Sequence, residues 1–489
     1  MAQPLFFMRD QLVNQVQGFL QGCGLWFRDA QLLVALSGGP DSLALSHVLW
    51  RLMRGDGPQI TLFHLDHTIR GDAARADAAF VVALATAWDL PLVREQRDVP
   101  ALARAWKLGL PAAARRARYE LLAATARRLG VQAVAVAHQA DDQAETVLLH
   151  LLRGAGPAGL RGMLPLTPGR QWAAEYLGAE SLHLMPPLIR PLLTTPRDEI
   201  LQYCADQQLS PRDDASNRDR HYARSRLRHD LLPALIAENP QAVAALGRTA
   251  RICAEDYAFL QAQLDAIWPE LAEISSAWVR LHAGPWNDLH PTLQRYALRR
   301  AASALGAAEP SLAQIEAART LPSGSGMILI ADLLVERDQR GLTVGTPDAS
   351  AMPQLAVDRV LLEPGVTGIG AGWELVLGAD PPEATDRWWL ALDRAALSGD
   401  LAVRRRRPGD RFRPLGGRGS RRLQDYFVDV RLPRPLRNAW PILICADTIV
   451  WPIGWRPDER FVARPETTDT IWVGARKEDQ RIHDTTAQG

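Results

Sequence analysis

The sequence predicts an α/β protein with a doubly wound, mostly parallel sheet, followed by a helical region and a small strand-rich α+β region. The sheet is predicted because short apolar runs at residues 32–36, 60–65 and 131–137 alternate with segments of helical periodicity. The later regions are predicted because residues 231–321 keep a helical pattern without a strand-like run. Residues 360–451, in contrast, contain several short apolar runs.

Length and composition indicate a globular protein of about three domains. The chain has 489 residues, of which 47% are hydrophobic and 23% charged, as is ordinary for globular proteins. We expect a sheet domain at residues 1–230, a mainly helical domain at 231–345, and a basic domain with a mobile tail at 346–489. Residues 327–330 and 342–344 resemble a hairpin that closes the helical domain.

The cysteines and the N-terminus favour a cytoplasmic protein. Cys23, Cys204, Cys253 and Cys445 form no C-x-x-C pair, so neither a zinc ribbon nor a dithiol redox site is predicted, and a reducing compartment is expected. The apolar residues 5–8 are too few for a signal peptide. No uncharged apolar stretch approaches about twenty residues, so we expect no membrane span.

Further elements of the sheet domain follow from periodicity and capping signals. Amphipathic helices are expected at residues 10–27, 73–88 and 112–129, and a third strand begins near residue 91. Another helix is expected to begin at Thr195, because threonine can cap a helix and the next residue is proline. Strands that alternate with helices place ligands at the carboxyl ends of the strands.

The loop after the first apolar run is the first candidate site. It consists of Ser37, Gly38, Gly39, Pro40, Asp41 and Ser42. Glycine lets the main chain approach a ligand closely, and loop N–H groups together with a helix N-terminus bind anions. The local pattern fits an ordinary strand-to-helix connection equally well.

Three acids form the second candidate site, at the end of the run at residues 131–137. His138 ends the strand, and Asp141, Asp142 and Glu145 follow on one helical turn. Acids in a first helical turn can simply complement the helix dipole. Three of them beside a histidine and an anion-binding loop favour a site for Mg²⁺ or an ammonium group. The nearby stretch from His64 to His67 has no third ligand at a zinc spacing.

Two arginine-rich stretches are candidate nucleic-acid contacts. Residues 211–229 mix arginine, aspartate and asparagine, which fits either a solvated face or a substrate-facing hinge. Residues 404–437 are denser in arginine and carry interleaved aromatic side chains, which is typical of a polyanion-binding surface. A merely basic, solvated face is the alternative.

These motifs together resemble the tRNA(Ile)-lysidine synthetase family, within the PP-loop superfamily of N-type ATP pyrophosphatases. The loop at residues 37–42 resembles the superfamily's S-G-G-x-D-S motif, which differs from Walker A because it lacks a lysine. Further motifs of the family follow in the expected order over nearly the whole chain, at residues 64–70, 113–119, 138–154, 214–229, 408–425 and 452–454. Pro111 stands where the family usually has glutamate, and Ser225 where it has asparagine.

The resemblance implies an enzyme that forms a C–N bond. ATP would adenylate the C2 oxygen of the wobble cytidine in a tRNA(Ile) with a CAU anticodon. Free L-lysine would then displace AMP to give lysidine, with pyrophosphate as the other product. The implied cofactors are ATP, as substrate, and Mg²⁺. The implied partners are this tRNA and L-lysine. No membrane partner is expected from the lack of a long apolar stretch, and an oligomer is possible.

The residues are assigned to this chemistry as follows. Residues 37–42 would hold pyrophosphate, with Asp41 and Asp142 as candidate Mg²⁺ ligands. Arg115 and Arg118 are candidates for phosphate or activated-base contacts. The acids Asp141, Asp142 and Glu145 would share the metal and the lysine ammonium groups, and His138 is a candidate proton acceptor. Candidate tRNA contacts are Arg224, Arg226, Arg228, Arg411, Arg421 and Arg422.

Two alternatives remain open. One is another PP-loop tRNA-modifying or nucleotide-adenylating enzyme. A tRNA 2-thiolase would call for cysteine pairs, however, and a nucleotide synthetase would not need the basic final domain. The other is a non-catalytic tRNA-binding protein, in which we would expect damage to the loop or to the acidic turn.

Overall fold

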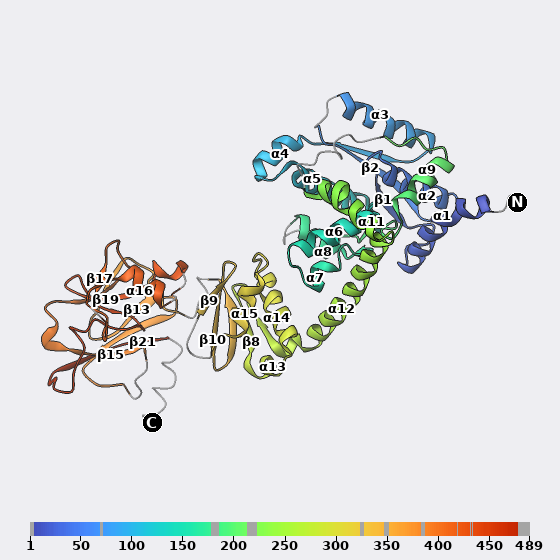
Figure 1. The fold of residues 1–489 in the computed structure, drawn as a ribbon. Helices are drawn as coiled ribbons and strands as arrows, with labels where there is room; N and C mark the ends of the chain where they lie inside the picture. The colour runs from blue at the N-terminus through green and yellow to red at the C-terminus, as the bar shows by residue number, and fades with distance from the viewer. Residues whose placement is uncertain are drawn as a thin grey trace. The chain divides into compact units, whose positions relative to one another are not determined.

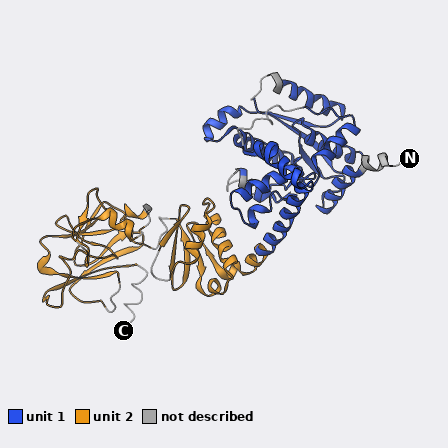
Figure 2. Ribbon diagram, viewed as in Figure 1, with its two compact units in different colours: residues 1–260 blue, residues 261–489 orange. Residues whose placement is uncertain are grey.

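The computed structural model describes residues 4–68, 72–177, 185–212, 223–322, 327–346, 352–382, 387–417, 419–430, 432 and 434–477 (Figure 1). The chain divides into two compact units, Met1–Leu260 and Gln261–Gly489 (Figure 2). The expected mobile tail after Lys477 and the motif at residues 214–217 lie outside the described residues. The division into three domains stays a prediction.

The first unit contains the predicted doubly wound sheet. Its six strands have the order β3-β2-β1-β4-β6-β5, and every pair is parallel except β5 with β6. The strands are β1 Gln31–Ala35, β2 Gln59–Asp66, β3 Leu92–Gln96, β4 Ala133–Ala135, β5 Leu166–Thr167 and β6 Leu188–Ile189. The prediction of an α/β fold with a mostly parallel sheet is therefore confirmed.

Both faces of this sheet are covered by helices. Alternate strand residues point to opposite sides and so pack into different cores. Leu32 and Val34 of β1 pack into a core with residues of α1, α2, α3 and α9, whereas Leu33 packs with residues of α5 and α8. These helices are α1 Pro4–Gly22, α2 Pro40–Met53, α3 Asp72–Ala87, α5 Leu110–Leu129, α8 Gly169–Leu177 and α9 Arg197–Asp206. The remaining elements of this part of the chain are α4 Val99–Trp106, α6 Ala140–Leu152, α7 Pro157–Leu160, α10 Ala223–Arg226, the π-helix η3 Leu227–Leu231, α11 Leu232–Glu238 and α12 Ala242–Leu271.

Two helix starts refine the sequence predictions. Thr195 does not cap α9, because Pro196, with extended backbone angles, occupies the cap position. The Thr195 hydroxyl instead accepts a hydrogen bond from Gln15 Nε2 at 2.8 Å. Pro111 lies in the first turn of α5, where a proline costs no helix hydrogen bond. The proline at this position is therefore compatible with an intact helix.

After the end of α12, the second unit continues with an α+β region, so the domain predicted as mainly helical also contains a sheet. Helices α13 Ala283–Asp288, α14 Pro291–Ala304 and α15 Leu312–Arg319 accompany a five-stranded antiparallel sheet of order β7-β8-β11-β10-β9. Its strands are β7 Ala272–Ile274, β8 Trp278–His282, β9 Met327–Ile330, β10 Leu333–Asp338 and β11 Gly341–Gly345. The sequence prediction missed β7 and β8, although Val279 and Leu281 are buried in strand alternation. The predicted hairpin of β9 with β11 is wrong, because β10 pairs between them.

The rest of the second unit is strand-rich, as predicted. It forms two four-stranded sheets, β12-β16-β19-β20 and β13-β14-β21-β15, and a small β17–β18 pair. The strands are β12 Arg359–Leu361, β13 Gly365–Gly370, β14 Trp373–Gly378, β15 Trp389–Asp393, β16 Leu401–Arg404, β17 Arg411–Phe412, β18 Arg421–Arg422, β19 Ile442–Cys445, β20 Thr448–Pro452 and β21 Thr470–Lys477. Helix α16 Leu423–Asp429 and the 3₁₀ turns η5 Arg394–Ala396 and η6 Arg434–Arg437 complete it. Across the described residues, no helix combines the length and apolarity that crossing a membrane requires.

Candidate active site

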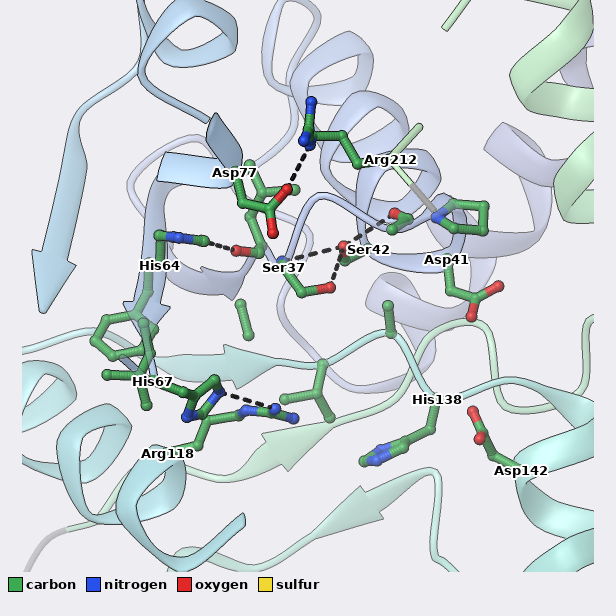
Figure 3. Close-up of a pocket in the computed structure, with 18 of the residues that line it drawn as sticks. Ser37, Asp41, Ser42, His64, His67, Asp77, Arg118, His138, Asp142 and Arg212 are labelled. Atoms are coloured by element: carbon green, nitrogen blue, oxygen red, sulfur yellow. Dashed lines mark hydrogen bonds and ion pairs between the residues drawn. The ribbon is translucent and has the colours of Figure 1, made fainter. Parts of the chain in front are cut away.

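The loop between β1 and α2 is held in shape by its two serines (Figure 3). Ser42 Oγ accepts a hydrogen bond from the Ser37 amide at 3.1 Å and donates to the Gly39 carbonyl at 3.1 Å. The Ser37 hydroxyl lies 3.0 Å from Ser42 Oγ. Gly38 has φ +91°, which favours glycine, and Gly39 is the cap residue of α2. The loop therefore presents main-chain N–H groups at a helix N-terminus, which is an anion-binding arrangement.

A cavity of about 390 Å³ opens at the carboxyl ends of β1, β2 and β4, around this loop (Figure 3). Several predicted site residues line it, namely Ser37, Gly39, Pro40, Asp41, Ser42, Arg118, His138, Asp142 and Arg228. The remaining predicted residues of this unit do not, namely Gly38, Arg115, Asp141, Glu145, Arg224 and Arg226. The loop and one acid of the predicted acidic turn thus share one cavity.

Asp41 is the acid nearest the loop, in the first turn of α2. Its Oδ2 lies 3.8 Å from Arg197 Nη1, whereas its Oδ1 is buried and has no hydrogen-bond partner among the described residues. Burial raises the pKa of the Asp41 carboxyl to about 6, and the guanidinium of Arg197 opposes this rise only in part. An unsatisfied buried carboxylate oxygen beside an anion-binding loop fits a ligand of a phosphate-bound Mg²⁺.

The acidic turn begins α6 and has a structural role in that helix. Gln139 caps the helix. Its side-chain Oε1 accepts a hydrogen bond from the Asp141 main-chain N–H at 2.6 Å, and its main-chain N–H donates to Asp142 Oδ2 at 3.1 Å. The capping role of a first-turn acid, which we considered as an alternative, is therefore real for Asp142. Burial, and then the charge of Glu145, raises the pKa of Asp141.

Two arginines from the α10–η3 segment bind the same acids. Arg224 Nε and Arg228 Nε donate to the two oxygens of Glu145 at 2.6 Å and 2.5 Å, and the Glu145 side chain is fully buried. The Nη2 atoms of both arginines also donate to Asp142 Oδ1, at 3.2 Å and 3.0 Å. Two residues predicted to contact tRNA thus neutralise two of the acids predicted to bind substrate.

His138 lies at the end of β4 with its Nδ1 already in use. Arg190 Nε donates to His138 Nδ1 at 3.3 Å, which places the proton of the neutral ring on Nε2. Burial and then the positive charge of Arg190 hold the pKa of His138 well below its usual value. The imidazole is therefore neutral at pH 7 and can donate through Nε2.

Arg115 and Arg118 of α5 have different surroundings. Arg115 donates from Nε and Nη2 to the Tyr176 hydroxyl at 3.0 and 2.6 Å, and it lies over the Tyr119 ring. Arg118 lines the cavity, with its Nη2 3.3 Å from His67 Nε2. The two arginines therefore differ in their access to a ligand, since only Arg118 reaches the cavity.

The histidines of β2 and its following turn do not form a metal site. His64 Nδ1 lies 2.9 Å from the Leu36 carbonyl oxygen, so this histidine braces the loop. No three His, Cys, Asp or Glu side chains among the described residues gather as a metal site would require.

Three polar residues near the loop were not among the predicted site residues. Asp77 of α3, Arg197 at the start of α9, and Arg212 all line the cavity. Arg212 donates its main-chain N–H to the Gly38 carbonyl at 3.0 Å, and its Nε forms an ion pair with Asp77 (Figure 3). Only the charge density of residues 211–229 hinted at Arg212, and nothing in the sequence pattern marked Asp77.

A second cavity, of about 500 Å³, lies beside β17 and β18 in the second unit. We call its arginines the basic cavity set; they are Arg411, Arg421, Arg422 and Arg456. Tyr426 lines the same cavity, and the guanidinium of Arg421 lies 5.8 Å from the centre of its ring and pairs with Asp429. Arg411 Nη2 donates to the Ser420 carbonyl at 3.0 Å. Exposed arginines around an aromatic ring suit a phosphate-rich ligand.

Part of the basic run at residues 404–407 is structural rather than exposed. Arg404 is only 3% exposed and binds both oxygens of Asp410, at 2.9 and 2.8 Å. Arg405 donates to the main-chain carbonyls of Leu355 and Ala356. The predicted polyanion surface is therefore narrower than the arginine count suggests, and the basic cavity set is its best-formed part.

A Ser-Gly-Gly-Pro-Asp-Ser loop between a parallel strand and a helix, opening onto one acid-lined cavity, defines an ATP-utilising enzyme of the PP-loop class. Accordingly, the family model of the PP-loop domain matches residues 8–235. The models of the TilS substrate binding domain and the TilS substrate C-terminal domain match residues 281–342 and 401–472. The chain belongs to the tRNA(Ile)-lysidine synthase family.

Two relatives illustrate this membership. The chain is 36% identical over 492 residues to a tRNA(Ile)-lysidine synthase of Symbiobacterium thermophilum, with 95% of this chain and 98% of the relative covered. It is 33% identical over 470 residues to a tRNA(Ile)-lysidine synthase of Dehalococcoides mccartyi, with 92% and 96% covered. The similarity thus extends over both units of the chain.

Proposed function

We propose that this enzyme ligates L-lysine to C2 of the wobble cytidine in a tRNA(Ile) with a CAU anticodon. The cytidine is first adenylated by ATP, and lysine then displaces AMP, so that the products are lysidine, AMP and pyrophosphate. One observation carries the proposal most directly: the PP-loop and an acid of the acidic turn open onto the same cavity, in a chain related to tRNA(Ile)-lysidine synthases over almost its entire length.

ATP and Mg²⁺ are assigned to the loop end of the cavity. The N–H groups of residues 37–42 would hold the pyrophosphate portion, and Asp41 would hold Mg²⁺ through its unsatisfied Oδ1. When bound, Mg²⁺ neutralises charge that develops on the phosphates. Asp142, the other candidate ligand, is the weaker one, because its two oxygens already accept hydrogen bonds from Gln139 and from the two arginines of the α10–η3 segment. One protein carboxylate suffices, because phosphate oxygens and water complete the shell of a nucleotide-bound Mg²⁺.

The acidic turn is assigned to the lysine substrate. Asp141, Asp142 and Glu145 are the carboxylates that could hold its ammonium groups, and Asp142 is the one that reaches the cavity. Because Arg224 and Arg228 occupy Asp142 and Glu145, lysine has to replace at least one of these arginine contacts. The attacking amine must lose its proton before it reacts, and Asp141, whose pKa is raised by burial, is a candidate acceptor for that proton.

His138 is assigned a role other than that of proton acceptor. A ring whose Nδ1 is already bonded and whose pKa is lowered is a poor base. We infer that His138 donates from Nε2 to an oxygen of the activated cytidine or of the α-phosphate. Arg118 lines the same cavity and stays a candidate for a phosphate contact, whereas Arg115 is bound to Tyr176.

The tRNA body is assigned to the second unit, chiefly through phosphate contacts. Arg411, Arg421 and Arg422 keep their proposed role, and Arg456 joins them because it lines the same cavity. Arg226 stays a candidate contact nearer the active site. A tRNA substrate also favours the cytoplasm as the compartment of the reaction.

Each alternative function leaves one of these observations unexplained. A nucleotide synthetase does not explain the match to two TilS substrate domains. A non-catalytic tRNA-binding protein does not explain an intact loop with an unsatisfied acid.

Incorporation of radiolabelled lysine tests the proposal. The protein is incubated with ATP, Mg²⁺, labelled lysine and the CAU-anticodon tRNA(Ile), with elongator tRNA(Met) as the control substrate. We expect label only in tRNA(Ile), and we expect Asp41→Ala to abolish it. Equal labelling of both tRNAs, or full labelling by Asp41→Ala, would contradict the proposal.

A further inference from the structure

The loop at residues 37–42 contains no lysine or arginine. The whole chain contains only two lysines, Lys107 and Lys477, and neither lines the cavity. A triphosphate keeps net negative charge even when Mg²⁺ is bound, so it needs further cationic partners. Within the described residues, four arginines line the cavity: Arg118, Arg197, Arg212 and Arg228.

Two of these four arginines already have a partner or an assigned role. Arg228 pairs with the fully buried Glu145, and breaking a buried pair of this kind is costly. Arg118 contacts His67 at the end of β2. Arg228 is therefore held in place by the protein itself, and Arg118 already stands as a candidate phosphate contact.

Arg197 and Arg212 are held more loosely, each against a partly exposed carboxylate. Arg197 lies 3.8 Å from Asp41, a distance too long for a hydrogen bond, and Arg212 pairs with Asp77. Their side chains are 43% and 40% exposed, and ion pairs with this much solvent contribute little to stability. Each arginine can therefore exchange its carboxylate partner for a stronger anionic one.

The main chain directs both arginines to the loop. The Arg212 N–H donates to the Gly38 carbonyl, so the position of this residue follows that of the loop. Arg197 begins α9, whose buried residues Ile200 and Cys204 share a core with α2, the helix that starts at the loop. An anion at the loop would thus lie within reach of both side chains.

We propose that Arg197 and Arg212 bind the β- and γ-phosphates of ATP, each giving up its carboxylate partner for phosphate oxygens. The inference rests on the proposed use of ATP and adds two substrate-binding residues to it. Asp77 then acts as a stand-in anion that holds Arg212 next to the loop until ATP arrives. Arginine suits this role because its planar fork forms two hydrogen bonds to a phosphate.

The sign of the effect at Asp77 distinguishes this proposal from a merely structural ion pair. If Arg212 binds phosphate, Arg212→Ala weakens MgATP binding, whereas Asp77→Asn removes a competing and repelling carboxylate and leaves binding as tight or tighter. If the pair only stabilises the fold, both substitutions act in the same direction.

Calorimetric titration of the full-length protein with MgATP, and separately with AMP, provides the test. We expect Arg197→Ala and Arg212→Ala to weaken MgATP binding about tenfold or more, with AMP binding unchanged. Arg28→Ala, which breaks the exposed pair with Asp56, is the matched control and should bind MgATP as the wild type does. MgATP binding by Arg212→Ala at wild-type strength, or an equal loss for AMP, would overturn the inference.

Failure of this inference is separable from failure of the proposed function. Wild-type protein that forms lysidine, together with an Arg212→Ala variant that binds MgATP normally, overturns only the role of the arginines. Tight, arginine-dependent MgATP binding without lysidine formation overturns only the reaction. Should Arg212→Ala fold poorly, Arg197→Ala in the same titration still decides the question.

Discussion

At the scale of single residues, Asp41 combines a functional position with a local cost in stability. Its Oδ1 has no partner among the described residues, and burial raises its pKa to about 6. A buried carboxylate oxygen that the protein leaves unsatisfied is available to a metal ion. A local cost of this kind is expected where a ligand completes the site.

Asp41 predicts a pH dependence for MgATP binding. Its pKa in the folded protein lies above the ordinary value, so the neutral form dominates below about pH 6. Binding of Mg²⁺ needs the carboxylate, and MgATP affinity should fall as the pH drops through about 6. Titrations from neutral to mildly acidic pH measure this. Asp41→Asn should bind weakly at every pH, and a wild-type affinity that stays constant across the range would count against the assignment.

For the neighbouring His138, we expect no contribution to the pH dependence of the rate. Because its imidazole is already neutral at pH 7, replacing it should lower the rate without changing the shape of the pH–rate profile. The comparison is between wild type and His138→Asn at saturating substrates. Loss of an ionisation near the usual histidine value in the variant would show that His138 is a base after all.

At the scale of elements, α6 and the α10–η3 segment are joined by an ion network of two acids and two arginines. Glu145 is fully buried with two arginine partners, so Glu145→Gln removes one of the two acids that compensate these guanidiniums. We expect a loss of about 3–5 kcal/mol in the free energy of unfolding. Glu316 offers a matched control, because it also pairs with two arginines, Arg295 and Arg319, but is 33% exposed.

Unfolding of both variants by calorimetry checks this prediction. Glu316→Gln should cost less than about 1 kcal/mol, as exposed ion pairs do. Equal losses in the two variants would show that the burial of Glu145 does not govern the energy of the network.

At the scale of the whole molecule, tRNA binding should depend steeply on salt. Each neutralised phosphate releases a counterion, so the logarithm of the affinity should fall linearly with the logarithm of the salt concentration. Arg422→Ala, in the basic cavity set, should reduce this slope by about 1. Arg394→Ala, outside this set and paired with Asp469, is the control and should leave the slope unchanged. A flat salt response would contradict the assignment of this surface.

The fold of the first unit was predictable because its signals are local. Strand alternation, helix periodicity and the loop at residues 37–42 all act over short stretches. The missed strand β8 shows the limit, since it lies within a long helical pattern and pairs with β11, which is distant in the sequence. Periodicity carries no information on such distant partners.

The candidate site was predictable only in part, for the same reason. The PP-loop and the acids of α6 could be recognised from their spacing, whereas their partners could not. Arg224 and Arg228 were predicted to contact tRNA, but the fold places them on Asp142 and Glu145. Asp77 and Arg212 are separated by 135 positions, and only the fold brings them together beside the loop.

The most direct measurement of the two-step reaction withholds lysine. Protein, Mg²⁺ and ATP labelled with radioactive phosphorus at the α-phosphate are mixed with the CAU-anticodon tRNA(Ile), and the tRNA and small molecules are then separated. We predict pyrophosphate release with labelled AMP retained on the tRNA, followed by AMP release and lysidine formation once lysine is added. Release of ADP would contradict the proposed chemistry. So would the absence of labelled tRNA before lysine is added, if no lysidine forms afterwards.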